Sequence, residues 1–222
     1  IHGIKSILPN SAPQEWMDEY SLFPKSIQTM KDFYDYTDKK HGSKPYLGTF
    51  QSDGSIQWKT RHEVHLMALS VGTRLIELGL KMGDRIGIYA ENQLEVAVFI
   101  EAAQYFGFVI VISFDSAIYS YPGFTYHDSE CSAIYISKKK LDIAYKLQCE
   151  KLKSLQFLIV PEIPDTSPDS NLERLKDIRF VLFNELINRI DNFAAPPEIK
   201  PDTLATICYS SGTGGTPKGI NL

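Results

Sequence analysis

The stretch that decides the fold is residues 204–222, Leu-Ala-Thr-Ile-Cys-Tyr-Ser-Ser-Gly-Thr-Gly-Gly-Thr-Pro-Lys-Gly-Ile-Asn-Leu. Its apolar start, residues 204–209, is typical of a strand and leads directly into a loop rich in glycine and hydroxyl groups. Glycines let backbone N–H groups converge on an anion, hydroxyl side chains add further donors, and Lys218 adds a positive charge. The pattern therefore predicts a strand followed by a phosphate-binding loop. The alternative interpretation is a surface turn that is rich in Gly and Ser.

Spacing excludes two other kinds of phosphate loop. The pattern G-x-x-x-x-G-K-[ST], started at Gly212, needs a glycine at 217 and Ser or Thr at 219, where the chain has Pro217 and Gly219. The dinucleotide pattern G-x-G-x-x-G, started at the same glycine, also fails at Pro217. What remains is a hydroxyl-rich loop that ends in Thr-Pro-Lys-Gly.

Composition and charge limit the class of protein. The 222 residues are 43% hydrophobic and 12% aromatic, which is enough core for one large domain or two small ones. The net charge is -4, and the basic residues are scattered apart from the lysine triplet 138–140, so we expect no nucleic-acid partner. The triplet itself is typical of a solvated helix start. The longest apolar run, residues 105–114, is about half of the roughly 20 residues that cross a bilayer, so we expect no transmembrane segment.

The cysteines and histidines indicate no metal site. The 3 cysteines form no C-x-x-C pair, which favours an intracellular, reducing compartment. His62 and His65 miss the H-E-x-x-H spacing by one residue, so we expect two surface histidines and no metal. The chain begins with Ile1 and ends directly after the loop, from which we expect a fragment of a longer protein.

The order of apolar patterns predicts an α/β fold, a parallel sheet flanked by helices. We expect an extended arm over residues 1–26, a helix starting near Ser26, and a hairpin of strands 45–50 and 55–58. Thr60 and Glu63 form a capping box for a helix that ends at Gly79. Further strands are expected at 85–90, 108–112, 133–137 and 155–160, further helices at 93–106, 122–127, 141–152 and 180–190, and surface connectors near 161–171 and 194–202.

Residues 210–218 resemble the AMP-binding signature of the adenylate-forming superfamily, which usually reads Thr/Ser-Ser-Gly-Thr-Thr-Gly-x-Pro-Lys-Gly. Residues 81–92, Lys-Met-Gly-Asp-Arg-Ile-Gly-Ile-Tyr-Ala-Glu-Asn, are similar to a second segment of this superfamily, most of all in long-chain fatty acyl-CoA synthetases. Gly214 stands where the superfamily normally carries a hydroxyl, and one hydrogen bond to a charged phosphate contributes about 1.5 to 3 kcal/mol.

The resemblance implies a function. Residues 27–222 would be an incomplete N-terminal AMP-binding domain of a ligase that joins a carboxylic acid, here a long-chain fatty acid, to AMP with release of pyrophosphate. The acyl group would then pass to coenzyme A, and ATP and Mg²⁺ are the other implied cofactors. The residues implied to hold the phosphates of ATP are Ser210, Ser211, Gly212, Thr213, Gly214, Gly215, Thr216 and Lys218.

No catalytic residue is implied in this chain. In the superfamily the magnesium-binding glutamate, the adenine pocket, the ribose-binding aspartate and the catalytic lysine follow the signature, so we expect the 222 residues alone to be inactive. The implied location is cytoplasmic or peripheral on an internal membrane, so a peripheral membrane contact stays open. Two alternatives also stay open, a non-catalytic binding or regulatory protein of the same fold and an adenylate-forming enzyme for another carboxylic acid. An unrelated α/β nucleotide-binding module would need one of the two spacings that fail.

Overall fold

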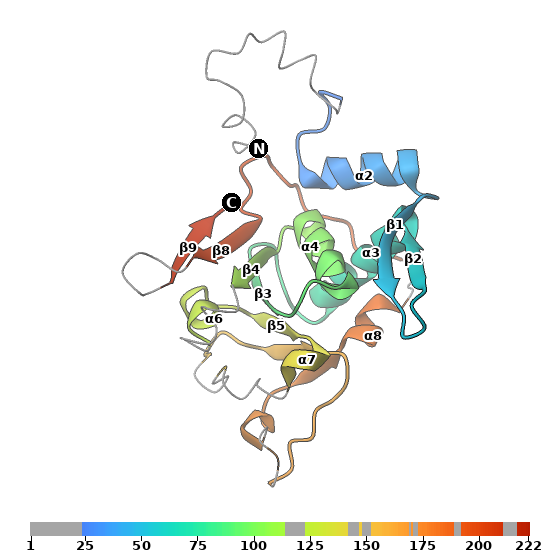
Figure 1. Cartoon of the computed structure of the whole chain (residues 1–222). Helices are drawn as coiled ribbons and strands as arrows, with labels where there is room; N and C mark the ends of the chain where they lie inside the picture. The colour runs from blue at the N-terminus through green and yellow to red at the C-terminus, as the bar shows by residue number, and fades with distance from the viewer. Residues whose placement is uncertain are drawn as a thin grey trace.

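The structure is a computed structural model that describes residues 24–113, 123–141, 147, 152–168, 170, 173–188, 192–210 and 217–222. Its strands form one sheet of seven strands and one hairpin of two strands (Figure 1). The arm expected over residues 1–26 lies outside the described residues except for residues 24–26, and most of the helix expected at 141–152 lies outside them as well.

The large sheet has the strand order β7-β6-β5-β3-β4-β8-β9. Its strands are β3 (Arg85–Tyr89), β4 (Val109–Ser113), β5 (Ala133–Ile136), β6 (Phe157–Val160), β7 (Phe180–Leu182), β8 (Thr206–Ser210) and β9 (Lys218–Asn221). All neighbours from β7 to β8 are parallel, and β9 runs antiparallel to β8. The parallel layer expected from the four strands between residues 85 and 160 is thereby confirmed.

Apolar cores cover both faces of this sheet, as its continuous apolar strands require. Every residue of β5 and β6 is buried. One face packs against α3 (Arg61–Glu77), α4 (Leu94–Phe106) and α8 (Phe183–Ile187), whose buried residues share a core with Ile86 and Ile110. The other face packs against α6 (Phe124–Asp128) and α7 (Lys138–Leu141), which share a second core with Val111 and Ile134. A short 3₁₀ helix, η4 (Glu173–Leu175), precedes β7.

The N-terminal part adds one helix and the hairpin. α2 (Met30–His41) places the buried Tyr34 in the core of α3 and α4. β1 (Pro45–Phe50) and β2 (Ile56–Thr60) pair antiparallel, which confirms the expected hairpin. The capping box of Thr60 with Glu63 is also present and starts α3. None of the described helices is long and apolar enough to cross a membrane.

Three expectations about elements were wrong. The first helix starts at Met30 rather than near Ser26, because Thr29 and not Ser26 forms a capping box, with Asp32. Residues 180–190 do not form one helix, since Phe180–Leu182 pairs with β6 as the outer strand before α8 begins. The lysine triplet is not fully solvated: Lys140 is buried, with its ammonium 5.6 Å from the centre of the Tyr89 ring.

Candidate phosphate-binding hairpin

Strands β8 and β9 enclose the glycine- and hydroxyl-rich segment. Ser210 is the last residue of β8, Lys218 is the first residue of β9, and the two are register partners. Residues directly opposite in an antiparallel pair have Cβ atoms about 5 Å apart and point to the same side. The Ser210 hydroxyl and the exposed Lys218 ammonium therefore belong to one face at the base of the loop. The other expected site residues, 211–216, lie outside the described residues.

The topology brings this base to the edge where ligands bind in open α/β sheets. β8 runs parallel to β4, and β4 runs parallel to β3, so Ser210 stands at the carboxyl end of a parallel strand. Ligands of such sheets bind outside the carboxyl ends of the strands. Ser210 thus lies at the edge of the sheet where ligands of such folds bind.

Tyr209 anchors β8 from the opposite face. Its ring is buried in the core of α6 and α7, and its hydroxyl donates to Asp128 Oδ2 at 2.6 Å. Burial raises the pKa of Tyr209, and the hydrogen bond and negative charge of Asp128 raise it further, so the phenol stays protonated and donates at neutral pH. Because neighbouring side chains alternate along a strand, an inward Tyr209 turns Ser210 to the other face.

Gly219 explains why the loop ends in Lys-Gly. It is the register partner of Tyr209. A Cβ at Gly219 would lie 3.1 Å from Ile207 Cγ2 and 3.2 Å from Tyr209 Cζ, closer than ordinary contact. Glycine therefore lets β9 lie directly against the Tyr209 ring. Sequence reasoning missed Tyr209 and Asp128, because the only signal for them was the glycine that follows Lys218.

The two histidines of α3 differ from each other. His62 is exposed, as expected, and its Nδ1 lies 3.0 Å from Asp38 Oδ1. His65 is buried, which corrects the expectation of two surface histidines: its Nδ1 lies 2.7 Å from Glu101 Oε1. Glu101 in turn accepts two hydrogen bonds from Arg61, at 2.8 and 2.6 Å. Within the described part of the chain, no group of three His, Cys, Asp or Glu side chains could hold a metal ion.

A parallel α/β sheet with a glycine- and hydroxyl-rich segment at its carboxyl edge is the architecture of a nucleotide-binding α/β protein. Residues 35–222 match the family described as AMP-binding enzyme. The chain belongs to this family.

Relatives and solved structures agree with the family. The peroxisomal long chain acyl-CoA synthetase 7 of Arabidopsis thaliana is 30% identical over 212 residues, which cover 91% of this chain and 30% of that protein. An anthranilate CoA ligase in complex with anthranoyl-AMP is 20% identical, with a TM-score of 0.70 over 87% of this chain and 34% of that one. A fatty acyl CoA synthetase of Mycobacterium tuberculosis is 19% identical, with a TM-score of 0.64 over 90% of this chain and 35% of that one.

These likenesses have different weights. The two solved structures share the fold, which agrees with the expected parallel α/β layer. The sequence relatives confirm the resemblance to long-chain acyl-CoA synthetases. The chain spans about 30% of the length of these relatives.

Proposed function

We propose that this chain is part of a longer ATP-dependent ligase that activates a long-chain fatty acid. The acid attacks the α phosphorus of ATP, which forms acyl-AMP and releases pyrophosphate. The acyl group then forms a thioester with coenzyme A and AMP leaves. In this proposal residues 27–222 are an incomplete AMP-binding domain, and residues 1–26 are an arm that precedes it.

The pairing of Ser210 with Lys218 at the carboxyl edge of the sheet carries the proposal. A hydroxyl donor and an ammonium group on one face suit an anion with several oxygens, and a polyphosphate is such an anion. The substrate class rests on the names of the relatives, among them long chain acyl-CoA synthetases of Arabidopsis thaliana.

The residues of the loop act by electrostatics and position. Ser210, Lys218 and the hydroxyl and backbone donors of residues 211–216 hold the β and γ phosphates, so that the carboxylate can attack the α phosphorus in line. Lys218 would contact the pyrophosphate as the pyrophosphate leaves. Mg²⁺ would enter bound to ATP, since no group of three His, Cys, Asp or Glu side chains among the described residues could hold it.

The change Lys218→Ala in the longer protein tests the proposal. We expect the rate of acyl-AMP formation to fall at least about tenfold, because hydrogen bonds to charged groups contribute about 1.5 to 3 kcal/mol. Transfer from preformed acyl-AMP to coenzyme A should stay nearly unchanged, since that step does not use the β and γ phosphates. Pyrophosphate release and thioester formation, measured separately, distinguish the two steps.

The matched control is Lys200→Ala. Lys200 is exposed as well, but it lies in the connector that leads into the amino end of β8. Lys218, in contrast, lies opposite the carboxyl end of β8. It should leave both steps unchanged. If Lys218→Ala slows both steps equally, or neither, residues 210–218 do not hold the phosphates. If the longer protein binds ATP but forms acyl-AMP from no acid, the result favours the alternative of a non-catalytic binding protein. The sequence observation that favours this alternative is Gly214, at a position where the superfamily normally carries a hydroxyl.

A further inference from the structure

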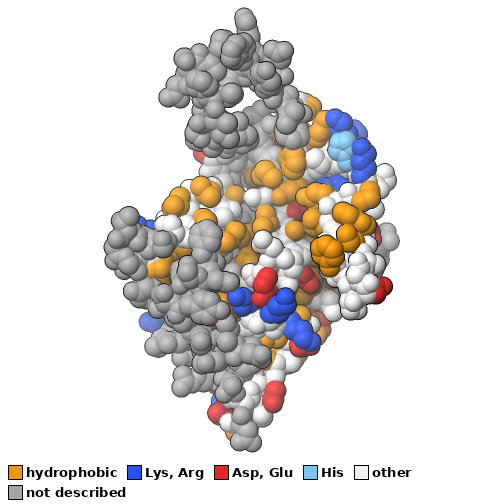
Figure 2. All heavy atoms as spheres, in the orientation of Figure 1, with side chains coloured by type: hydrophobic (Ala, Val, Ile, Leu, Met, Phe, Trp, Pro, Cys, Tyr) orange, Lys and Arg blue, Asp and Glu red, His pale blue; other side chains and the backbone are white. Residues whose placement is uncertain are grey.

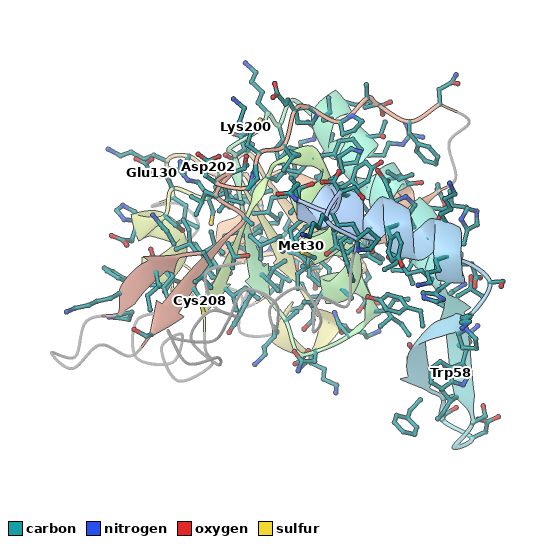
Figure 3. The ribbon with its side chains drawn as sticks, turned by 90° about the horizontal axis from the view of Figure 1, so that it is seen from above. Met30, Trp58, Glu130, Lys200, Asp202 and Cys208 are labelled. Carbon is teal, nitrogen blue, oxygen red and sulfur yellow. The ribbon has the colours of Figure 1, made fainter. Side chains whose placement is uncertain are left out.

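The β1–β2 hairpin exposes an apolar face. Phe50 pairs with Ile56 and Gly48 pairs with Trp58, so these four residues share one side of the hairpin. Phe50 is 79% exposed and Trp58 is 54% exposed, and Ile56 is exposed too. The ring of Tyr46 lies instead against the buried Arg61, with its centre 5.2 Å from the guanidinium carbon. Figure 3 shows Trp58 on a hairpin that projects away from the body of the molecule.

The opposite side of the hairpin fixes this orientation. Leu47 alternates with the exposed residues and packs against the core of α3 and α4. A Cβ at Gly48 would lie 2.7 Å from Ile56 Cγ2 and 3.1 Å from Trp58 Cζ3. The side chains of Ile56 and Trp58 thus lie over Gly48. The result is a continuous apolar surface on one side of the hairpin, whose other side contacts the core through Leu47.

Basic residues border this surface. Lys39 and Lys40 end α2, Lys44 directly precedes β1, and all three are exposed. Figure 2 shows Lys, Arg and His side chains next to the hydrophobic side chains of the hairpin, on the same face of the molecule.

Two of the nearby carboxylates lie against basic groups: Asp38 is 3.0 Å from His62 Nδ1, and Glu63 accepts from Lys59 Nζ at 3.2 Å. Asp53 accepts only from the neutral Ser55, at 2.9 Å from its backbone N–H, and remains an anion in the turn. The turn is at the end of the hairpin away from Lys44, so the border at the end of α2 and the start of β1 is basic.

We propose that the hairpin face, defined as Phe50, Ile56 and Trp58 with the border Lys39, Lys40 and Lys44, docks on an anionic lipid surface. Trp58 suits the boundary between water and acyl chains, where its apolar ring and its polar N–H are both satisfied, and Phe50 and Ile56 would bury apolar surface there. Lysines next to them add attraction to anionic headgroups, about 1 kcal/mol each. The combination of an aromatic face with a basic rim favours lipid over a protein groove. This proposal does not depend on the proposed function, because docking needs no ATP.

Trp58 itself can report the docking. The chain has 2 tryptophans, so Trp16→Phe leaves Trp58 as the single emitter. With vesicles of phosphatidylcholine and phosphatidylserine we expect its emission to shift to the blue and to be quenched by brominated acyl chains. Vesicles of phosphatidylcholine alone should give a much smaller effect, because the lysines then find no net charge.

Two pairs of variants separate the aromatic face from the basic rim. Phe50→Ser with Trp58→Ser should lower vesicle binding at least about tenfold in sedimentation, since each side chain contributes about 1.5 to 3 kcal/mol when fully buried. Its control is Ile163→Ser, which removes an apolar side chain of 56% exposure far along the chain. Lys39→Gln with Lys44→Gln should lower binding to the anionic vesicles about 30-fold, from about 1 kcal/mol for each lysine. Its control is Lys138→Gln with Lys139→Gln, two exposed lysines of α7.

Four results would overturn the proposal. The first is binding that both hairpin variants leave unchanged, and the second is sedimentation with vesicles without any change in Trp58 emission. The third is a hairpin variant that turns a dimer into a monomer without a loss of lipid binding, which would make a second copy the occupant. The fourth is a longer protein in which vesicles leave Trp58 emission unchanged because another segment covers the face.

Discussion

The base of the loop depends on two residues that face each other, Tyr209 and Gly219. Tyr209 cannot move away from a new side chain on β9, because its ring is buried and its hydroxyl is bonded to Asp128. We therefore expect Gly219→Ala to lower the free energy of unfolding of the 222-residue chain by about 1 kcal/mol or more, the usual cost of overpacking. Urea unfolding measures this change.

The control for this experiment is Ile220→Ala on the same strand. Ile220 is half exposed, so its truncation should cost less than about 0.5 kcal/mol. An unchanged midpoint for Gly219→Ala would mean that β9 does not lie against Tyr209. The sequence shows that a glycine follows Lys218 but not why it is needed. The reason is the Tyr209 ring, which is bonded to Asp128, 81 positions away in the sequence.

At the scale of elements, the start of α3 makes stability depend on pH. The backbone N–H of Thr60 donates to Glu63 Oε2 at 2.8 Å, and this bond, with that from Lys59, lowers the pKa of the Glu63 carboxyl. A carboxyl with a lowered folded-state pKa stabilises the fold above its ordinary pKa, about 4.3, and loses this contribution as the pH falls through the folded-state value. We expect Glu63→Gln to lower the free energy of unfolding at neutral pH and to flatten its decline below about pH 4.5.

Urea unfolding of both proteins at several pH values tests the cap. If the free energies of unfolding of the two proteins differ by the same amount at every pH, the ionisation of Glu63 contributes nothing to stability. This cap is also a feature that the sequence predicted correctly, because Thr60 and Glu63 lie three positions apart and need no distant partner.

The contact between α3 and α4 contains a buried ion pair that sequence reasoning did not find. Arg61 and Glu101 are 40 positions apart in the sequence and form two hydrogen bonds with each other. Both are buried, with 3% and 2% of their surface exposed. Removing the charge of one partner leaves the other buried without compensation, so we expect Glu101→Gln to lower the free energy of unfolding, measured with urea, by about 3 kcal/mol.

Arg74→Ala is the matched control in α3. Its exposed pair with Glu77 should contribute less than about 1 kcal/mol. Equal costs would mean that the Arg61 pair is solvated.

Short apolar runs limited the prediction of elements. Residues 180–187 suit a helix by their pattern, but their first three residues are β7 because β6 offers a free edge. Lys218 and Gly219 were expected to end the loop and instead begin the strand β9 for the same reason, since β8 offers its other edge. In both cases the partner strand decided the conformation, and the partner is not visible in a local window.

For the whole molecule, the alternation of strands and helices predicted a parallel sheet but not its strand order. β4 and β5 lie on either side of β3, although both follow it in the chain. The side taken by each crossover depends on which helix covers which face, so local patterns leave it open. The signature itself was predicted from residue types and spacing, because glycine, hydroxyl and lysine at fixed positions carry their chemistry in the sequence.

The completeness of the site is a property of the whole molecule. The described part of the chain offers Ser210 and Lys218 on one side of the proposed polyphosphate, and adenylation needs positioning and electrostatic stabilisation on both sides of the reacting phosphorus. We therefore expect the purified 222-residue chain to form no acyl-AMP from ATP, Mg²⁺ and a long-chain acid, whereas the longer protein forms it under the same conditions. Chromatography of acyl-AMP from radiolabelled acid measures both. The 222-residue chain must first show a cooperative urea transition, so that inactivity is not mistaken for unfolding. Acyl-AMP formed by the short chain, and lost in its Lys218→Ala variant, would mean that the 222 residues contain a complete adenylation site.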